Sequence, residues 1–319
     1  MLKLSFVLLL VGLAVCSPPV TKTREQIESF RNFLENSRTE HGVRLSERML
    51  ANPKASEWEN SGKFEGDILL DDWQVDALVQ QYSGARNAYI WPGTKWPENT
   101  IVYEFGEDEF NDEQKEAIMV SIRDIEENTC LKFRERRSGE FNYVKLTGRS
   151  DGCYANVGYW HDRGLHIMNL ARNIPGQGCF RHTTIVHEWL HIIGFFHMQS
   201  TYNRDDYVRI MWDNIWPGME HNFEHYDTNI VHNMGLPYEY TSCMHYGPYG
   251  FSTNGEPTIV PIRSFEGEMG QQVYVTEYDW HRTRRHYNCP GGWSKDMNSE
   301  VDEQKVIFVE EGQEVPYDE

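Results

Sequence analysis

Short hydrophobic runs bounded by polar and glycine-containing stretches predict several strands in the central part of the chain. Residues 100–105 alternate as a strand does, and residues 143–146 form a second such run. Residues 151–160 are rich in glycine and aromatic side chains and predict a third strand with loops. Residues 166–170 predict a short fourth strand. We therefore expect short strands joined by irregular connections.

Hydrophobic residues spaced three and four apart predict helices before and between these strands. Residues 23–40 and residues 113–128 each carry such a spacing, and Asp112 precedes the second run as a candidate helix cap. Thr276 resembles a helix start, and that helix should run to about residue 287. The long stretch before Thr276 is aromatic and polar without clear periodicity, and we expect it to be rich in loops.

Candidate catalytic and metal-binding residues are most concentrated in residues 187–197, His-Glu-Trp-Leu-His-Ile-Ile-Gly-Phe-Phe-His. A helix that begins at Thr183 or Thr184 places His187 and His191 on one face, because they are four residues apart. Two imidazoles in that arrangement can bind one metal ion. The motif therefore predicts a metal site on a helix.

Gly194 and His197 extend this motif beyond a bare pair of histidines. Glycine tolerates positive φ and lets the chain leave the helix, so that His197 returns as a third ligand. Three imidazoles with one open position are typical of a catalytic zinc site, and Glu188 is placed to handle a water there. The alternatives are surface histidines on an amphipathic helix, or a structural zinc site, which would favour cysteine ligands.

Length and charge restrict the class of protein. The 319 residues suffice for one large domain or two modest ones, and a hydrophobic content of 39% supports a packed core. The formal net charge of −19 argues against nucleic acid as a partner.

The N-terminus has the layout of a secretory signal peptide over residues 1–16. Lys3 precedes a hydrophobic run that is too short to span a membrane, and small residues surround a cut after Cys16. An uncleaved anchor is the alternative. No later stretch approaches the length of a membrane span, so we expect a secreted, extracellular protein.

Five of the six cysteines remain after this cut: Cys130, Cys153, Cys179, Cys243 and Cys289. An oxidising compartment permits disulfides. The odd count leaves at least one thiol free or paired between chains, and the sequence alone does not set the pairing.

The two ends of the chain differ from its middle. Residues 17–86 are highly charged, lack cysteine and end in a small, flexible run whose last residue, Arg86, suits a trypsin-like protease. This region is either a disordered linker or a pro-segment. Residues 291–319 are strongly acidic, and we expect a solvated, largely disordered tail.

On these residues the chain resembles the astacin-type zinc endopeptidases, a branch of the metzincins. The resemblance spans roughly residues 86–289 and includes one motif upstream. Four motifs carry it: the zinc sequence 187–197, the Met-turn Ser-Cys-Met-His-Tyr at 242–246, the run 204–208, and the run 251–259.

The resemblance implies an α/β (α+β) peptidase domain over residues 87–290, with two lobes and the active site between them. The upper lobe would hold a twisted mixed sheet and the zinc helix, and the lower lobe would be irregular and end in a C-terminal helix. Met244 would form a hydrophobic floor beneath the zinc, and Tyr246 would be a further zinc ligand that swings away to stabilise the oxyanion. The implied disulfides are Cys130–Cys289 and Cys153–Cys179.

The resemblance also reaches into the pro-segment. The run Phe-Glu-Gly-Asp at 64–67 matches the family's F-x-G-D motif, which implies that Asp67 binds the zinc in the zymogen and displaces the catalytic water. A carboxylate is a good zinc ligand. Cleavage between Arg86 and Asn87 by an activating trypsin-like protease would then remove this block.

The implied activity is that of a secreted zinc-dependent endopeptidase, which binds one Zn²⁺ per chain and hydrolyses protein or peptide substrates. Glu188 would take the proton of the attacking water and deliver it to the leaving amine. The strand at 166–170 is either a substrate-binding edge or an ordinary sheet strand.

Three positions depart from the family pattern. Met198 stands where a glutamate normally follows the third histidine, Thr201 replaces an arginine, and Asn203 replaces an aspartate. That glutamate usually joins, through water, to the new N-terminus. A buried ammonium without a partner is costly, so we expect that Asn87 does not dock in the usual way.

Two other functions fit part of the sequence. A secreted protein on a peptidase scaffold could bind partners with reduced or lost turnover, which the altered cluster around Met198 would favour. A matrix component with a vestigial site is the other, but no cysteine-rich module follows Cys289. The full set of site residues favours the active endopeptidase over both, and over other metzincin branches.

Overall fold

The structure, a computed structural model, describes residues 22–39, 44–84, 95–228 and 230–293. The expected signal peptide, the Arg86–Asn87 cleavage site and nearly all of the acidic tail lie outside these residues.

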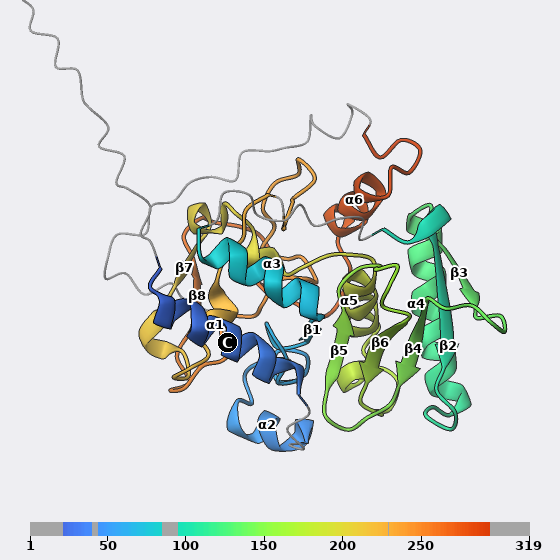
Figure 1. Ribbon diagram of the computed structural model, residues 1–319, viewed down its shortest axis with the longest axis horizontal. Helices are drawn as coiled ribbons and strands as arrows, with labels where there is room; N and C mark the ends of the chain where they lie inside the picture. Colours follow the sequence, from blue (N-terminus) through green and yellow to red (C-terminus); the bar gives the residue numbers. More distant parts are fainter. Residues whose placement is uncertain (1–21, 40–43, 85–94, 229, 294–319) are drawn as a thin grey trace, which may run out of the picture.

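A mixed six-stranded sheet forms one part of the molecule (Figure 1). The strand order is β1-β5-β6-β4-β2-β3, and all neighbouring pairs are parallel except β5 with β6. The mixed α/β fold class expected from the sequence is confirmed. The strands are β1 (Ile68–Leu69), β2 (Thr100–Phe105), β3 (Lys132–Glu135), β4 (Tyr143–Thr147), β5 (Cys153–Asn156) and β6 (Leu165–Leu170).

The strand at 166–170 is not an edge of this sheet. It corresponds to β6, which pairs with β4 on one side and with β5 on the other. Of the two alternatives for this strand, the substrate-binding edge is therefore wrong and the ordinary sheet strand is confirmed. Strand order is set by tertiary pairing, which a hydrophobic run does not encode. The next strand, β5, carries β1 from the N-terminal segment on its outer side.

Two helices pack against each other and against the sheet: α4 (Asp112–Asn128) and α5 (His182–Ile192). The cap of α4 is Asn111, not Asp112, because the Asn111 side chain accepts a hydrogen bond from the Gln114 amide at 2.8 Å. Helix α5 begins one or two residues earlier than the sequence predicted.

The part after His197 is largely irregular, as expected, apart from short 3₁₀ turns and one small antiparallel sheet of β7 (Val208–Ile210) and β8 (Ile259–Pro261). Helix α6 (Glu277–His286) follows, with Thr276 and Asp279 forming the predicted capping box. Among the described residues, the 3₁₀ turns are η1 (Pro97–Asn99), η2 (Gly178–Phe180), η3 (Met198–Ser200), η4 (Arg204–Asp206), η5 (Trp212–Asn214) and η6 (Glu220–Phe223).

The N-terminal segment is folded onto the rest of the molecule in its described part, so the linker alternative does not hold there. Helix α1 (Arg24–Arg38) was expected from the sequence, whereas α2 (Leu45–Ala51) and α3 (Asp72–Tyr82) were not. Helices α1 and α3 pack together across one face (Figure 1).

A hydrophobic cluster joins this segment to the remainder of the chain. Phe30, Leu34, Phe64, Ile68, Leu70, Val75, Leu78 and Val79 come from the segment, and Val157, Phe196, Tyr226, Ile230 and Val231 come from the rest.

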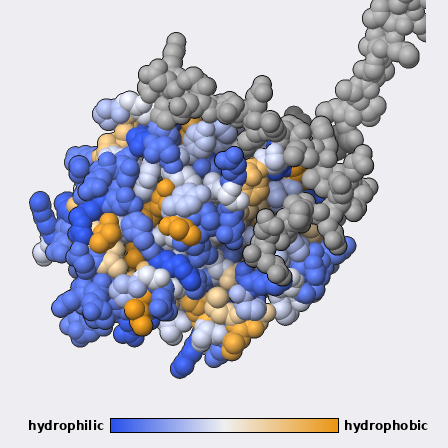
Figure 2. Space-filling view, turned by 180° about the vertical axis from the view of Figure 1, so that it is seen from behind, coloured by the Kyte–Doolittle hydropathy of each residue, from blue (hydrophilic) through white to orange (hydrophobic). Residues whose placement is uncertain are grey.

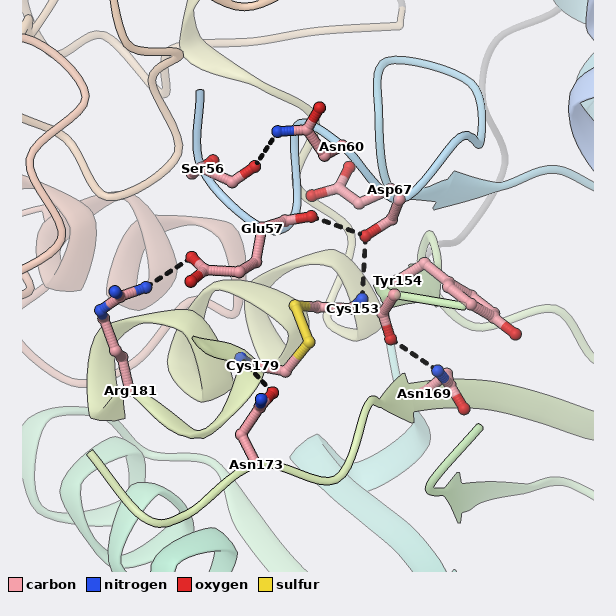
Figure 3. The surroundings of a disulfide bond; sticks show 12 residues. Ser56, Glu57, Asn60, Asp67, Cys153, Tyr154, Asn169, Asn173, Cys179 and Arg181 are labelled. Atoms are coloured by element: carbon pink, nitrogen blue, oxygen red, sulfur yellow. Dashed lines mark hydrogen bonds and ion pairs between the residues drawn. A yellow bond between two sulfur atoms is a disulfide. The ribbon is translucent and has the colours of Figure 1, made fainter. Parts of the chain in front are cut away.

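Two disulfides fasten the ends of the main elements. Cys130–Cys289 joins the end of α4 to the end of α6, and Cys153–Cys179 joins β5 to the turn before α5 (Figure 3). These are the pairs that the family resemblance implies, and Cys243 is left as a free, buried thiol. Each crosslink stabilises the fold by about 2–4 kcal/mol.

The surface seen from behind Figure 1 is mainly hydrophilic, with scattered hydrophobic patches (Figure 2). Within the described residues, no helix is both long enough and apolar enough to cross a bilayer.

Helix α4 provides a test of the main hydrophobic core, in which Ile125 is buried together with Val144 of β4 and Trp189 of α5. Ile125 is fully buried against α5 and the sheet, whereas Val120 on the same helix is 41% exposed. Ile125→Ala should lower the free energy of unfolding of the full chain by about 2–5 kcal/mol because it leaves a cavity. Val120→Ala should change it by less than about 0.5 kcal/mol. Chemical denaturation followed by circular dichroism measures both, and equal effects would contradict the packing described.

Candidate metal centre

Helix α5 places His187 and His191 in the interior with their ring orientations fixed by backbone carbonyls. The Nδ1 atom of His187 lies 2.6 Å from the Cys243 carbonyl oxygen, and that of His191 lies 2.8 Å from the Phe195 carbonyl oxygen. Because a carbonyl only accepts, each Nδ1 carries the proton and each Nε2 keeps its lone pair. Both rings are thus prepared as metal ligands.

The turn after α5 brings a third imidazole to the same place. Gly194 has a φ of 112°, and its amide closes the turn on the His191 carbonyl at 2.8 Å. The chain then returns, and the ring centroid of His197 lies 4.9 Å from that of His191. His197 is fully buried.

Asp67 of the N-terminal segment faces all three rings. Its Oδ2 lies 2.8 Å from His187 Nε2, and its Oδ1 lies 3.3 Å from the Nε2 atoms of both His191 and His197. The four ligand atoms all lie within 4.8 Å of one another. The structure therefore brings together the four residues that the sequence singled out.

These residues fit a metal ion. Asp67 Oδ1, His191 Nε2 and His197 Nε2 are buried and have no hydrogen-bond partner. Buried polar atoms are nearly always paired, and a shared cation would satisfy all three. Three imidazoles and one carboxylate suit zinc in number and type.

The charges around the site favour a cation. Burial lowers the pKa of His187 to about 4, so that its imidazole is neutral. Burial also disfavours the charged form of His197, but the carboxylates of Asp67 and Glu65 outweigh it and raise the pKa of His197 to about 9. The two carboxylates thus leave an excess of negative charge that a divalent metal ion would neutralise.

Glu188 follows the first of these histidines on α5. It is fully buried, and neither carboxylate oxygen has a hydrogen-bond partner. Burial, followed by the charge of Asp67, raises its pKa well above the ordinary value. A carboxyl group in this state can exchange a proton with a water or substrate placed beside it.

The turn at 242–246 is tied directly to the metal centre. The carbonyl oxygen of Cys243 orients His187, and that of Met244 accepts a hydrogen bond from the Met198 amide at 2.8 Å. The Tyr246 ring lies 5.0 Å from the His197 ring, and its buried hydroxyl has no hydrogen-bond partner. Burial, together with the smaller effect of the negative charge on Asp279, raises the pKa of Cys243 well above its ordinary value, so the thiol stays protonated.

Two residues at the site were missed by sequence reasoning. Glu65 bonds His197 Nδ1 and Ser200 Oγ, each at 2.8 Å, although it occupies the variable position of the 64–67 motif. Trp58 stacks on His197 with centroids 5.0 Å apart and planes 12° apart, and lies 4.3 Å from the His187 ring. Nothing in the sequence around Trp58 indicated that its ring would contact the histidines.

The replacement at Met198 lies beside a cavity of about 360 Å³. Met198 is buried, and the only carboxylate among the described residues around the cavity is Asp279. Asp279 already accepts hydrogen bonds from the Ser242 hydroxyl, the Cys243 amide and Arg282. This cavity therefore holds no unpaired anion for an ammonium group.

Comparisons with known proteins agree on one family. The model of the Astacin peptidase family matches residues 89–288. Zinc metalloproteinase nas-4 of Caenorhabditis elegans is 35% identical over 71% of this chain and 69% of its own length. Seminal metalloprotease 1 of Drosophila melanogaster is 38% identical over 64% and 82%. Human meprin A subunit beta is 38% identical over 72% of this chain but only 30% of its own length.

A solved structure extends this likeness to three dimensions. High choriolytic enzyme 1, a hatching enzyme zinc-protease from the medaka fish Oryzias latipes, superposes with a TM-score of 0.54 at 32% sequence identity. The match covers 61% of this chain and 93% of that one.

Metal content tests the site directly. His191→Ala removes one of three imidazoles and should reduce retained zinc from about one per chain to a small fraction of that after dialysis. His182→Ala is the matched control, because His182 starts the same helix but pairs with Asp124 at 2.8 Å. Elemental analysis measures the retained zinc. Equal content in the His191→Ala variant and the native chain would contradict the site.

Proposed function

This chain belongs to the astacin family of peptidases, and on that premise we propose that it is a secreted zinc endopeptidase kept latent by residues 17–86. The observation that carries the proposal is the meeting of three buried imidazoles with Asp67 beside the unpaired, buried Glu188. Its substrates are proteins or peptides, and the reaction is hydrolysis of internal peptide bonds, as in the metalloendopeptidases of class EC 3.4.24.

Each residue of the site has one task in this reaction. His187, His191 and His197 hold the zinc ion. Zinc, when bound, supplies Lewis acidity that lowers the pKa of a coordinated water to about 7. Glu188 accepts the proton of the attacking water and passes it to the leaving amine.

Tyr246 provides the second half of the transition-state stabilisation. Its hydroxyl is buried next to His197 and lacks a partner, so it is free to donate to the oxyanion that forms on the peptide carbonyl. Met244 is buried in the hydrophobic core, and in this proposal it forms the hydrophobic floor of the site and takes no part in proton transfer.

Latency rests on two carboxylates of the segment 64–67. Asp67 lies where a water would be activated, and Glu65 bonds the Nδ1 atom of His197 on the other side of that ring. A trypsin-like protease would cut between Arg86 and Asn87 after the signal peptide has been removed. The Asp279 carboxylate already accepts hydrogen bonds, and Met198 is apolar, so neither offers a charge partner for the ammonium group of Asn87. Both observations support maturation by removal of Asp67 rather than by docking of Asn87.

A binding protein with lost turnover is the alternative function. Met198 is its only support, because every residue assigned to the reaction is present. Casein cleavage that appears after limited trypsin treatment and disappears with a chelator distinguishes the enzyme from the binding protein.

The role of Glu188 has a specific test. Glu188→Gln keeps the size of the side chain but cannot accept the proton, so the activated chain should lose about 10²–10⁴-fold in kcat/KM on a peptide substrate. Its zinc content should equal that of the native chain, because Glu188 is not a ligand. Unchanged kcat/KM with normal zinc would refute the assignment of Glu188 as the base.

Latency has a second test in the uncut chain. Asp67→Ala removes the carboxylate that faces the three histidines, and the uncut variant should cleave peptides at least about tenfold faster than the uncut native chain. Asp76→Ala, in the same segment but paired at the surface with Arg31, is the control and should remain latent. Peptide cleavage is measured with a trypsin inhibitor present throughout. If the Asp67→Ala chain is as inactive as the native chain, Asp67 does not cause latency.

A further inference from the structure

The N-terminal segment contacts the rest of the chain at several places, among them Lys54 on the Gly255 carbonyl and Glu59 on the Gly247 amide, and three of these places matter here. One is the metal centre, where Trp58, Glu65 and Asp67 contact the histidines. The second is the open side of β5, and the third is the hydrophobic cluster beneath α1 and α3. Only the first of these is needed to block a metal site.

The contact with β5 extends the sheet by one strand. The Ala155 amide donates to the Asp67 carbonyl at 3.0 Å, and the Asn156 side chain donates to the Leu69 carbonyl at 2.7 Å. Nearby, Glu57 points to Arg181 beside the Cys153–Cys179 disulfide and pairs with it at 2.5 Å (Figure 3). Backbone pairing and an ion pair therefore hold this part in register.

The third contact is hydrophobic and does not involve the three histidines themselves. Phe30 and Leu34 of α1 are completely buried in the cluster that includes Phe196, Tyr226 and Ile230 of the remaining chain. Helix α3 adds polar contacts there: Gln74 donates to the Val157 carbonyl at 3.1 Å, and Asp71 pairs with the nearly buried Arg163. Removing α1 and α3 would expose this hydrophobic surface to water.

All these contacts come from residues before Gly84. A cut anywhere between Gly84 and Lys95 separates the chains covalently but breaks none of the described contacts. Several weak sites on one segment bind together far more tightly than any of them alone, because binding at one holds the others in place.

We propose that the segment before the cut is an inhibitor in its own right, which stays bound after cleavage through the surface under α1 and α3. Activation then needs a second event, either further proteolysis inside the segment or its dissociation. This inference rests on the proposed function for its inhibitory effect, whereas retention of the segment does not depend on catalysis.

The experiment uses the full chain with residues 83–86 replaced by Ile-Glu-Gly-Arg, so that a site-specific protease cuts after position 86 and leaves Asn87 native. After complete cutting, size-exclusion chromatography at low micromolar concentration shows whether the two pieces elute together. Peptide cleavage is measured before and after the N-terminal piece is removed in mild denaturant and the zinc is restored.

We expect the pieces to elute together and the cut complex to show less than about one tenth of the activity of the separated peptidase piece, in line with several linked contacts. Adding the N-terminal piece back should restore inhibition. Separate elution with full activity at once after the cut would overturn the proposal. An inactive, zinc-loaded peptidase piece would instead refute the proposed function, and elution would still decide retention.

Variants at the surface under α1 and α3 test its role. Phe30→Ala should cause release of the N-terminal piece after the cut and raise activity at least about fivefold over the cut native chain, while the uncut chain stays latent. Trp73→Ala, which removes the stack on Trp160 with centroids 4.6 Å apart, is a second variant with the same expected direction. Leu50→Ala, at a side chain that is 84% exposed on α2, is the control. Retention and inhibition unchanged in both test variants would overturn the role of this surface.

Discussion

The structure depends on one electrostatic constraint: three imidazoles and two carboxylates meet in the interior, where water cannot solvate them. Such a group is stable only if every member has a partner. The Nδ1 atoms of His187 and His191 donate hydrogen bonds to the carbonyl oxygens of Cys243 and Phe195, and that of His197 donates to the Glu65 carboxylate. The Nε2 atoms of His191 and His197 have no hydrogen-bond partner and suit a metal ion.

This constraint explains why distant parts of the chain converge. Helix α5 supplies two rings at a spacing of four, a glycine turn supplies the third, and the turn at 242–246 supplies an orienting carbonyl. Asp67 comes from a segment that is 120 residues before His187. Its position is held by the sheet pairing of β1 and by the hydrophobic cluster under α1 and α3. The position of Asp67 at the histidines and the packing of its segment are therefore parts of one arrangement.

The accuracy of sequence reasoning varied with the range of the interaction. The α5 ligand pair and the capping box at Thr276 follow from contacts between residues three or four apart, and both were predicted. The cap of α4 was misplaced by one residue, because adjacent Asn111 and Asp112 are both good caps and only backbone conformation distinguishes them. The interior position of β6 could not be predicted, since pairing with β4 and β5 is a long-range event.

By itself, the sequence determined the candidate chemistry of the histidine-glutamate motif and the helical periodicity of the element that carries it. These are local properties, fixed by side-chain type and spacing. The role of Asp67 was implied only by the family resemblance. Only the tertiary structure decided that Trp58 packs against His187 and His197, that Glu65 bonds His197, and that α1 and α3 fold onto the remaining chain. Those contacts depend on which surfaces meet after folding, and burial of hydrophobic area, which has no direction along the chain, selects them.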